Sequence, residues 1–178
     1  MTKISMDDCF ANNTCWPEDR LERYRRVHGD TEGVPVFSIL TDPDISIVDK
    51  MWAVEAAELL SEDDMHWLAL DFAAHVMTEA NIEGMNAIKA KEAWMKGNND
   101  EETLHKAELA AWKESKNYHR SKAAAYASKT NATIALRGAA ALSAGAYGED
   151  VDPIEKRWQW GLIKERLGLK SSQKDVGL

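Results

Sequence analysis

Three polar residues, Asp71, His75 and Glu79, stand four positions apart in the chain. On a helix this spacing stacks side chains along one face, so the group could hold a metal ion or form an acid–base pair. The alternative is an ion pair on the one polar stripe of an otherwise apolar helix. We favour the ion pair, because nearly all the neighbouring residues are apolar.

A second pattern with metal-binding potential is Glu102-x-x-His105. Di-iron helical bundles use this spacing, but they need two such motifs and two further inward carboxylates. The nearest second candidate is Asp63-x-x-His66, which has Asp in place of Glu. Both motifs fall where helices are expected to start, and acidic side chains are favoured there without any metal. The sequence therefore predicts no metal site and no cofactor.

Basic and aromatic residues alternate in the middle of the chain. Such interleaving is typical of surfaces that bind nucleic acid or an acidic partner. The alternative is that these cations face the acidic N-terminal part of the same chain. Both interpretations stay open. As a candidate interaction surface the sequence offers Trp112, Lys113, Lys116, Tyr118, His119 and Arg120.

Bulk properties narrow the classes of function. The chain has 178 residues, a net charge of −8 and two cysteines. The negative charge argues against a protein that coats nucleic acid, and two cysteines do not make a disulfide framework. The sequence contains no Gly-rich phosphate loop, no Gly-x-Ser-x-Gly and no His-Glu-x-x-His. We therefore expect an acidic protein that is not an enzyme.

No apolar stretch like a signal peptide stands at the N-terminus, and no run of residues is apolar for long enough to span a membrane. These features predict a cytoplasmic protein with no membrane partner.

Apolar residues recur at helical spacing through most of the chain. The expected helices cover about 45–60, 62–80, 82–96 and 153–167. The helix over 62–80 is apolar almost all round, which predicts a central position in a bundle. Residues 101–147 are rich in alanine and lack proline. One helix of that length would be about 70 Å long, longer than a domain of this size is wide, so we expect a break near 128–138.

The predicted fold is all-α, a single-domain bundle of five to seven helices with a long alanine-rich helix. We expect an irregular arm with one short helix over 1–43, the helical bundle domain over 44–167 and a mobile tail over 168–178. Gly33–Thr41 has the composition of a strand but no partner strand in the chain, so we expect an extended segment packed on helices. Small residues along the alanine-rich helix would pack against another helix of the chain or against a second copy.

Three stretches of the chain together carry a family resemblance. They are Asp44–Val54 (DISIVDKMWAV), Met65–His75 (MHWLALDFAAH) and Ala87–Gly97 (AIKAKEAWMKG), followed by an acidic cap and the alanine-rich segment. This order resembles a family of small helical proteins encoded by tailed phages and prophages. It is also similar to an immunity-protein family of bacterial polymorphic-toxin systems. The resemblance covers about residues 44–147, brings no catalytic motif, and implies an accessory protein that acts by binding.

The hypothesis from the sequence is a phage- or prophage-encoded accessory protein that binds a host or bacterial protein, as an inhibitor or anti-defence factor, without catalysis. Two alternatives stay open. One is an immunity protein that neutralises a cognate bacterial toxin. The other is a metal-dependent helical enzyme that uses the acidic residues around His66, His75 and His105. Nucleic acid is the less expected partner, because of the negative net charge.

Overall fold

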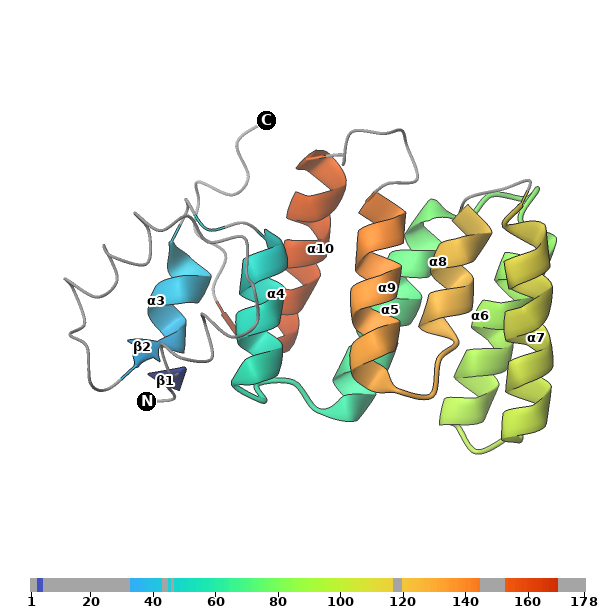
Figure 1. The fold of residues 1–178 in the computed structure, drawn as a ribbon, viewed down its shortest axis with the longest axis horizontal. Coiled ribbons are helices and arrows are strands. Elements are labelled where there is room, and N and C mark those ends of the chain that lie inside the picture. Colours follow the sequence, from blue (N-terminus) through green and yellow to red (C-terminus); the bar gives the residue numbers. More distant parts are fainter. Residues whose placement is uncertain are drawn as a thin grey trace. The chain divides into compact units, whose positions relative to one another are not determined.

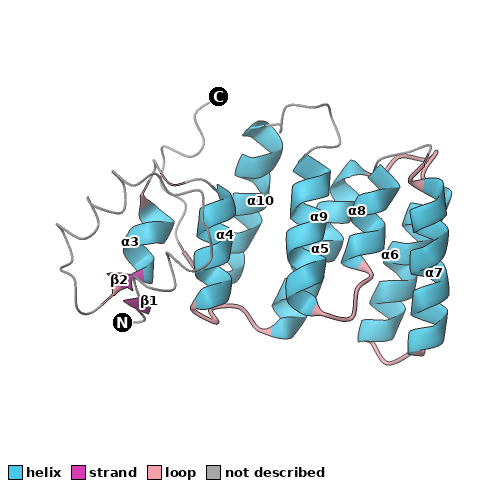
Figure 2. Cartoon of the chain, in the orientation of Figure 1, coloured by secondary structure: helices cyan, strands magenta, loops and turns pink. Residues whose placement is uncertain are grey.

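The computed structural model of the chain describes residues 3–4, 33–42, 45, 47–116, 120–144 and 153–169. These residues form helices and turns, apart from two short strands (Figure 1, Figure 2). The helices are α3 (Val36–Thr41), α4 (Ile47–Ala56), α5 (Glu62–Val76), α6 (Ile82–Met95), α7 (Glu101–Glu114), α8 (Arg120–Ala127), α9 (Ala132–Ala144) and α10 (Pro153–Arg166). The expected all-α fold is confirmed, with eight helices in the described residues, where the sequence predicted five to seven.

The chain divides into two compact units, Met1–Leu59 and Leu60–Leu178. The first unit contains β1 (Lys3–Ile4), β2 (Val34–Pro35), α3 and α4, and the second contains α5 to α10. The sequence placed α4 in the bundle domain, whereas in the structure it belongs to the first unit. Most of the expected arm and nearly all of the expected tail, residues 5–32 and 170–178, lie outside the described residues.

The segment Gly33–Thr41 corrects one expectation from the sequence. Strand β2 pairs antiparallel with β1, and α3 follows it directly, so the segment is neither unpaired nor extended throughout. Val36, Ile39 and Leu40 of α3 are buried. Their spacing places them on one face of a helix, and burial of that face outweighs the strand preference of the β-branched residues.

Helix α5 occupies the centre of the second unit, as predicted from the apolar residues on nearly all of its sides. It contacts α6, α8, α9 and α10. Leu68, Phe72 and Val76 of α5 are buried together with neighbouring alanines. Figure 1 shows α8 and α9 side by side in front of α5, α10 on the other side of α9, and α7 beside α6 and α8 at one end of the unit. The helix ends at Val76, earlier than the sequence suggested.

Several helix boundaries follow from local cap chemistry. Ser61 Oγ accepts a hydrogen bond from the N–H of Asp64 at 3.1 Å, and Asp100 Oδ1 accepts one from the N–H of Thr103 at 2.8 Å. These contacts satisfy amide groups that have no partner within the first turn. Gly97, just after α6, has a φ of +72°, which glycine adopts without strain at a helix C-terminus.

The alanine-rich segment forms three helices, α7, α8 and α9, in place of one. The expected break is confirmed between α8 and α9. There Ser128 Oγ donates to the carbonyl of Ala124 at 2.9 Å, and Asn131 Oδ1 accepts from the N–H of Ile134 at 2.9 Å. Both side chains offer the backbone an alternative to a continued helix. The earlier break, after Glu114, was not predicted.

Gly138, the other expected breaking point, lies inside α9. A Cβ at this position would lie 2.1 Å from Cδ1 of the Tyr126 ring, so the glycine permits α8 and α9 to approach closely. Helix α8 is lined with small buried side chains that serve the same purpose, Ala123, Ala124, Ala125 and Ala127. The alanines therefore pack against other helices of this chain.

Candidate functional site

The residues singled out by the sequence lie around the segment that joins α7 to α8. Lys113 and Lys116 are exposed, and Arg120, the first residue of α8, is partly exposed. Tyr118 and His119 lie outside the described residues. The structure therefore places two of the expected cations at the surface, next to each other at the end of α7.

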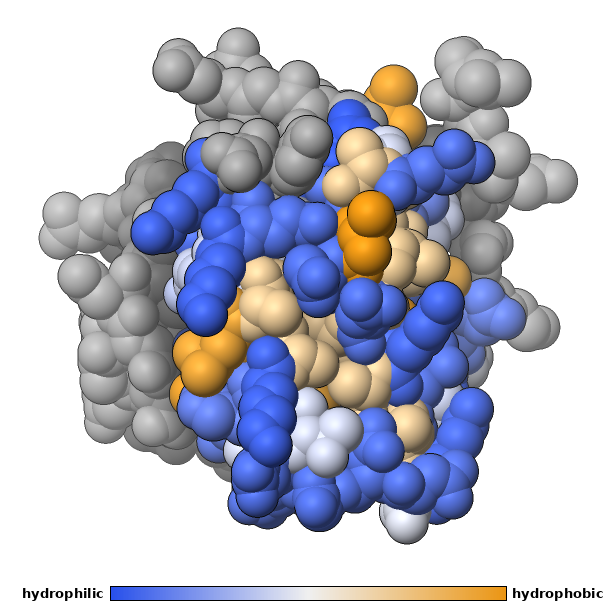
Figure 3. All heavy atoms as spheres, turned by 90° about the vertical axis from the view of Figure 1, so that its right-hand side faces the viewer, coloured by the Kyte–Doolittle hydropathy of each residue, from blue (hydrophilic) through white to orange (hydrophobic). Residues whose placement is uncertain are grey.

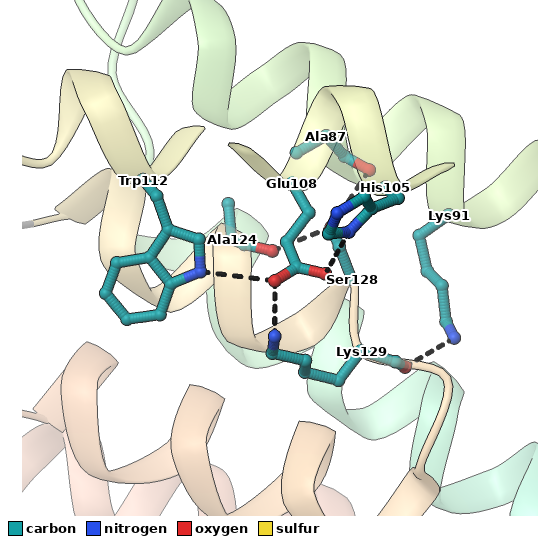
Figure 4. A network of polar contacts seen from close by, with 8 residues as sticks. All are labelled: Ala87, Lys91, His105, Glu108, Trp112, Ala124, Ser128 and Lys129. Atoms are coloured by element: carbon teal, nitrogen blue, oxygen red, sulfur yellow. Dashed lines mark hydrogen bonds and ion pairs between the residues drawn. The ribbon is translucent and has the colours of Figure 1, made fainter. Parts of the chain in front are cut away.

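Trp112, the remaining residue of the expected surface, belongs to a partly buried polar network (Figure 4). Its indole Nε1–H donates to Oε1 of Glu108 over 3.3 Å, and its ring packs edge-on against Tyr126. The same oxygen accepts a hydrogen bond from Nζ of Lys129, and the other carboxylate oxygen lies 3.7 Å from Nδ1 of His105. Glu108 is buried, so these donors offset the cost of removing its charge from water.

Lys91 of α6 extends the same network (Figure 4). Its side chain is completely buried, and its Nζ donates to the carbonyl of Lys129 at 2.8 Å and lies 3.9 Å from the centre of the Trp94 ring. Burial lowers the pKa of Lys91 from 10.5 to about 8. The hydrogen bond attaches the turn between α8 and α9 to α6, and the amine is not accessible from solvent.

The two motifs with metal-binding potential do not meet. His66 is buried on α5, with its ring edge-on to Trp94 at a centroid distance of 5.7 Å, and its Nδ1 has no hydrogen-bond partner. Burial and the charge of Lys91 lower the pKa of His66 from 6.5 to about 4. His105 is exposed on α7. Within the described ranges, no group of three or more His, Cys, Asp or Glu side chains could hold a metal ion.

His75 has a partner from another helix. Its Nδ1 lies 2.7 Å from Oε2 of Glu155 on α10, and its ring stacks on Trp158 at a centroid distance of 3.8 Å. The other carboxylate oxygen of Glu155 accepts a hydrogen bond from Nε2 of Gln159 at 3.2 Å. Glu79 lies beyond the end of α5. The structure thus pairs the histidine with an acidic residue 80 positions away, which no local pattern indicates.

Both helices of the α6–α7 hairpin carry exposed apolar side chains that the sequence had not singled out. Ile82 is 63 %, Leu109 45 % and Met85 36 % exposed. Figure 3 views this end of the molecule, where apolar side chains gather across the middle of the face and hydrophilic ones surround them. The sequence contains a signal for one of these residues. Leu104 and Ala111 are seven positions apart and are buried on the same side of α7, whereas Leu109 lies outside this spacing.

Lysines border these apolar side chains. Three of them are exposed and form no ion pair with any residue that the structure describes, namely Lys89, Lys113 and Lys116. The other two exposed lysines of the hairpin are paired near the α6–α7 turn, Lys96 with Glu92 and Lys106 with Glu102. The positive charge that has no ionic partner therefore lies away from the turn. We call Ile82, Met85, Leu109 and these three lysines the hairpin face.

Glu114 holds the end of the hairpin opposite its turn. Its carboxylate accepts the N–H groups of Glu83 and Gly84 at 3.1 and 3.0 Å and the hydroxyl of Ser121. Burial raises the pKa of Glu114, but the hydrogen bonds from Ser121 and the two amides outweigh this effect and lower the pKa overall. The carboxylate also lies at the N-terminus of α6, where the helix dipole favours negative charge. The two helices that carry the hairpin face are therefore connected at one end by the α6–α7 turn and at the other end by the hydrogen bonds of Glu114.

Comparison of the chain with protein-family models, with curated proteins and with solved structures finds no match. None of the described helices is long and apolar enough to cross a membrane.

Proposed function

We propose that this protein acts by binding a protein partner through the hairpin face. The observation that supports the proposal most directly is the joint exposure of Ile82, Met85 and Leu109. Apolar side chains that are grouped on one face and rimmed by polar residues are typical of interaction sites. Covering them would remove apolar surface from water, which is the main driving force of protein association.

The charge of the hairpin face supports a partner with an acidic rim. Leu109 and Lys113 are four residues apart on α7, and Met85 and Lys89 are four apart on α6, so each lysine lies next to an exposed apolar side chain. Complementary charge around an apolar centre accelerates encounter and excludes wrong partners. Lys113 and Lys116 belong to the interaction surface expected from the sequence, and their exposure is consistent with that expectation.

A protein partner fits this face better than a nucleic acid. Proteins that bind single strands stack bases on exposed aromatic rings. On the described part of the hairpin, however, the ring of Trp112 packs against Tyr126, and that of Trp94 lies against Lys91. The net charge of −8 also opposes approach to phosphates.

The role that we propose is that of a phage- or prophage-encoded inhibitor or anti-defence factor, which occupies a host protein and catalyses no reaction. An immunity protein would use the same kind of surface. The partner's identity separates the two roles, because an immunity protein should bind a toxin whose gene lies beside its own.

The test is capture of a partner from bacterial host lysate by three immobilised proteins. These are the wild type, the double variant Ile82→Glu/Leu109→Glu and the matched control Ile134→Glu, which changes an exposed isoleucine on α9. All three substituted positions are exposed, so folding should be preserved. The wild type and the control should retain one stoichiometric partner, and the double variant should lose it.

The isolated partner then permits a direct measurement of affinity. Lys113→Glu/Lys116→Glu should slow association about tenfold at low salt, and the difference should shrink as salt is added. A partner that the Ile82→Glu/Leu109→Glu variant still captures would contradict the proposed surface. Repeated failure of the well-folded wild type to capture any stoichiometric partner would contradict the proposed function.

A further inference from the structure

A groove runs between α5 and α10, away from the hairpin face. Its volume is about 540 Å³, within the range of sites that bind small molecules. Three of its lining residues come from α5 and three from α10: Asp64, Leu68, Asp71, Leu162, Glu165 and Arg166. The α5 residues are four and three positions apart, so they lie along one face of the helix.

The charges that line this groove are not balanced. Arg166 is the one cation among the lining residues, and its Nη1 lies 3.3 Å from Oδ1 of Asp64. Asp71 and Glu165 form no hydrogen bond or ion pair through their side chains with any described residue. The pKa of Asp71 is raised above its usual value, mainly by burial and in smaller part by the charge of Glu92, and Arg166 opposes this shift. The groove therefore holds more negative than positive charge among the residues that the structure describes.

The lining of the groove is mostly polar, with one leucine on each side. Leu68 is fully buried and Leu162 partly buried, and both are lining residues. Helices α5 and α10 run in opposite directions, since Asp64 meets Arg166 at one end and His75 meets Glu155 at the other. The stacked rings of His75 and Trp158 lie one helical turn beyond Asp71 and Leu162.

We propose that the α5–α10 groove binds a small organic cation, a primary amine or a guanidinium on a short hydrocarbon chain. The cationic group pairs with Asp71 and Glu165, and the short chain lies against the accessible part of Leu162. A bare metal ion fits less well, because the groove is much larger than an ion and Arg166 repels a divalent cation. An anion fits less well, because acidic residues outnumber the single arginine in the lining.

The test is calorimetric titration of the full chain at neutral pH with three probes of one length, 1-pentylamine, pentan-1-ol and pentanoate. The amine should bind saturably, and the alcohol and the carboxylate should bind at least about tenfold more weakly, since only the amine gains a charge-assisted hydrogen bond. Asp71→Asn should weaken amine binding by about tenfold. Glu62→Gln removes the same charge from an exposed position of α5 outside the groove, and it should leave the affinity unchanged.

A second variant guards against an indirect effect of Asp71→Asn. Leu162→Lys places an ammonium group of the chain itself in the groove and should abolish amine binding, while thermal unfolding verifies that the variant is folded. Equal affinity for the amine and the alcohol, unchanged affinity of Asp71→Asn or Leu162→Lys, or no saturable amine binding would each overturn the proposal. The groove and the hairpin face involve different helices, so neither result decides the other.

Discussion

The second unit holds charged side chains in two contrasting settings. In the network of α6, α7 and the α8–α9 turn, Glu108 meets Lys129 and Trp112, and Lys91 meets a carbonyl and an aromatic ring. In the α5–α10 groove, the side chains of Asp71 and Glu165 form no such bonds within the described residues. Charges with partners in the interior hold helices together, whereas charges without partners on a concave surface remain available to a ligand.

The physical reason for the contrast is the access of water. Glu108 and Lys91 are buried, so each would carry a large desolvation cost without a partner. Asp71 is partly exposed and Glu165 is exposed, so water can donate hydrogen bonds to their carboxyl groups. Three substitutions, taken from the largest expected effect to the smallest, test whether the two settings differ in this way.

Glu108→Ala should have the largest effect on stability. The change leaves the ammonium of Lys129 and the indole N–H of Trp112 without their acceptor. Glu108 is the buried member of this pair and Lys129 is partly exposed, so we expect a loss at the lower end for buried pairs, about 3 kcal/mol in the free energy of unfolding. Urea unfolding measures the loss, and Glu102→Ala, at an exposed pair with Lys106, is the control. The control should cost no more than about 0.5 kcal/mol. Equal losses in the two variants would show that the network is no more important than a surface pair.

Lys91→Met should change the dependence of stability on pH. The pKa of Lys91 is about 8 in the folded chain and 10.5 in the unfolded one. Between these values the unfolded chain binds more protons than the folded chain, so wild-type stability gains from this residue as the pH rises. The gain is at most about 3 kcal/mol, and the variant lacks it. Urea unfolding of both proteins across this interval measures the difference. Parallel pH profiles would mean that Lys91 titrates like an exposed lysine.

Asp71→Asn should have the smallest effect, and its sign should be opposite. Burial raises the pKa of Asp71, which means that the folded chain disfavours its charged form. The neutral amide removes that cost, so the midpoint of urea unfolding at neutral pH should rise slightly. Glu62→Gln, at an exposed position, should not share this increase. A lower midpoint for Asp71→Asn would indicate that the carboxylate stabilises the fold and is not reserved for a ligand.

The most predictable features of the fold were the helix boundaries that depend on a local signal. Ser61 and Gly97 act on residues within one turn of themselves, and the expected start near residue 62 and end near residue 96 agree with Glu62 of α5 and Met95 of α6. The break after Glu114 had no such signal, because neither glycine nor proline occurs in 115–119. It brings Ser121 of α8 back against Glu114, a contact that exists only when the hairpin and α8 are packed together.

The candidate sites were less predictable than the helices. The alternation of basic and aromatic residues indicated Lys113 and Lys116 as surface residues. Both side chains are exposed, which agrees with a surface role. Trp112 looked like part of the same surface, but its indole faces the carboxylate of Glu108. The groove between α5 and α10 had no signature in the sequence, because its two walls are separated by most of the second unit.

The sequence by itself determined that this chain is helical, that α5 is central and where several helices begin and end. Caps and apolar periodicity act over a few residues, so they can be read without knowing the packing. Only the tertiary structure decided the partners of Glu108, Lys91 and His75, which lie 21, 38 and 80 positions away in the chain. Such pairs depend on which helix faces meet, and that choice is made by burial of apolar surface from the whole unit at once.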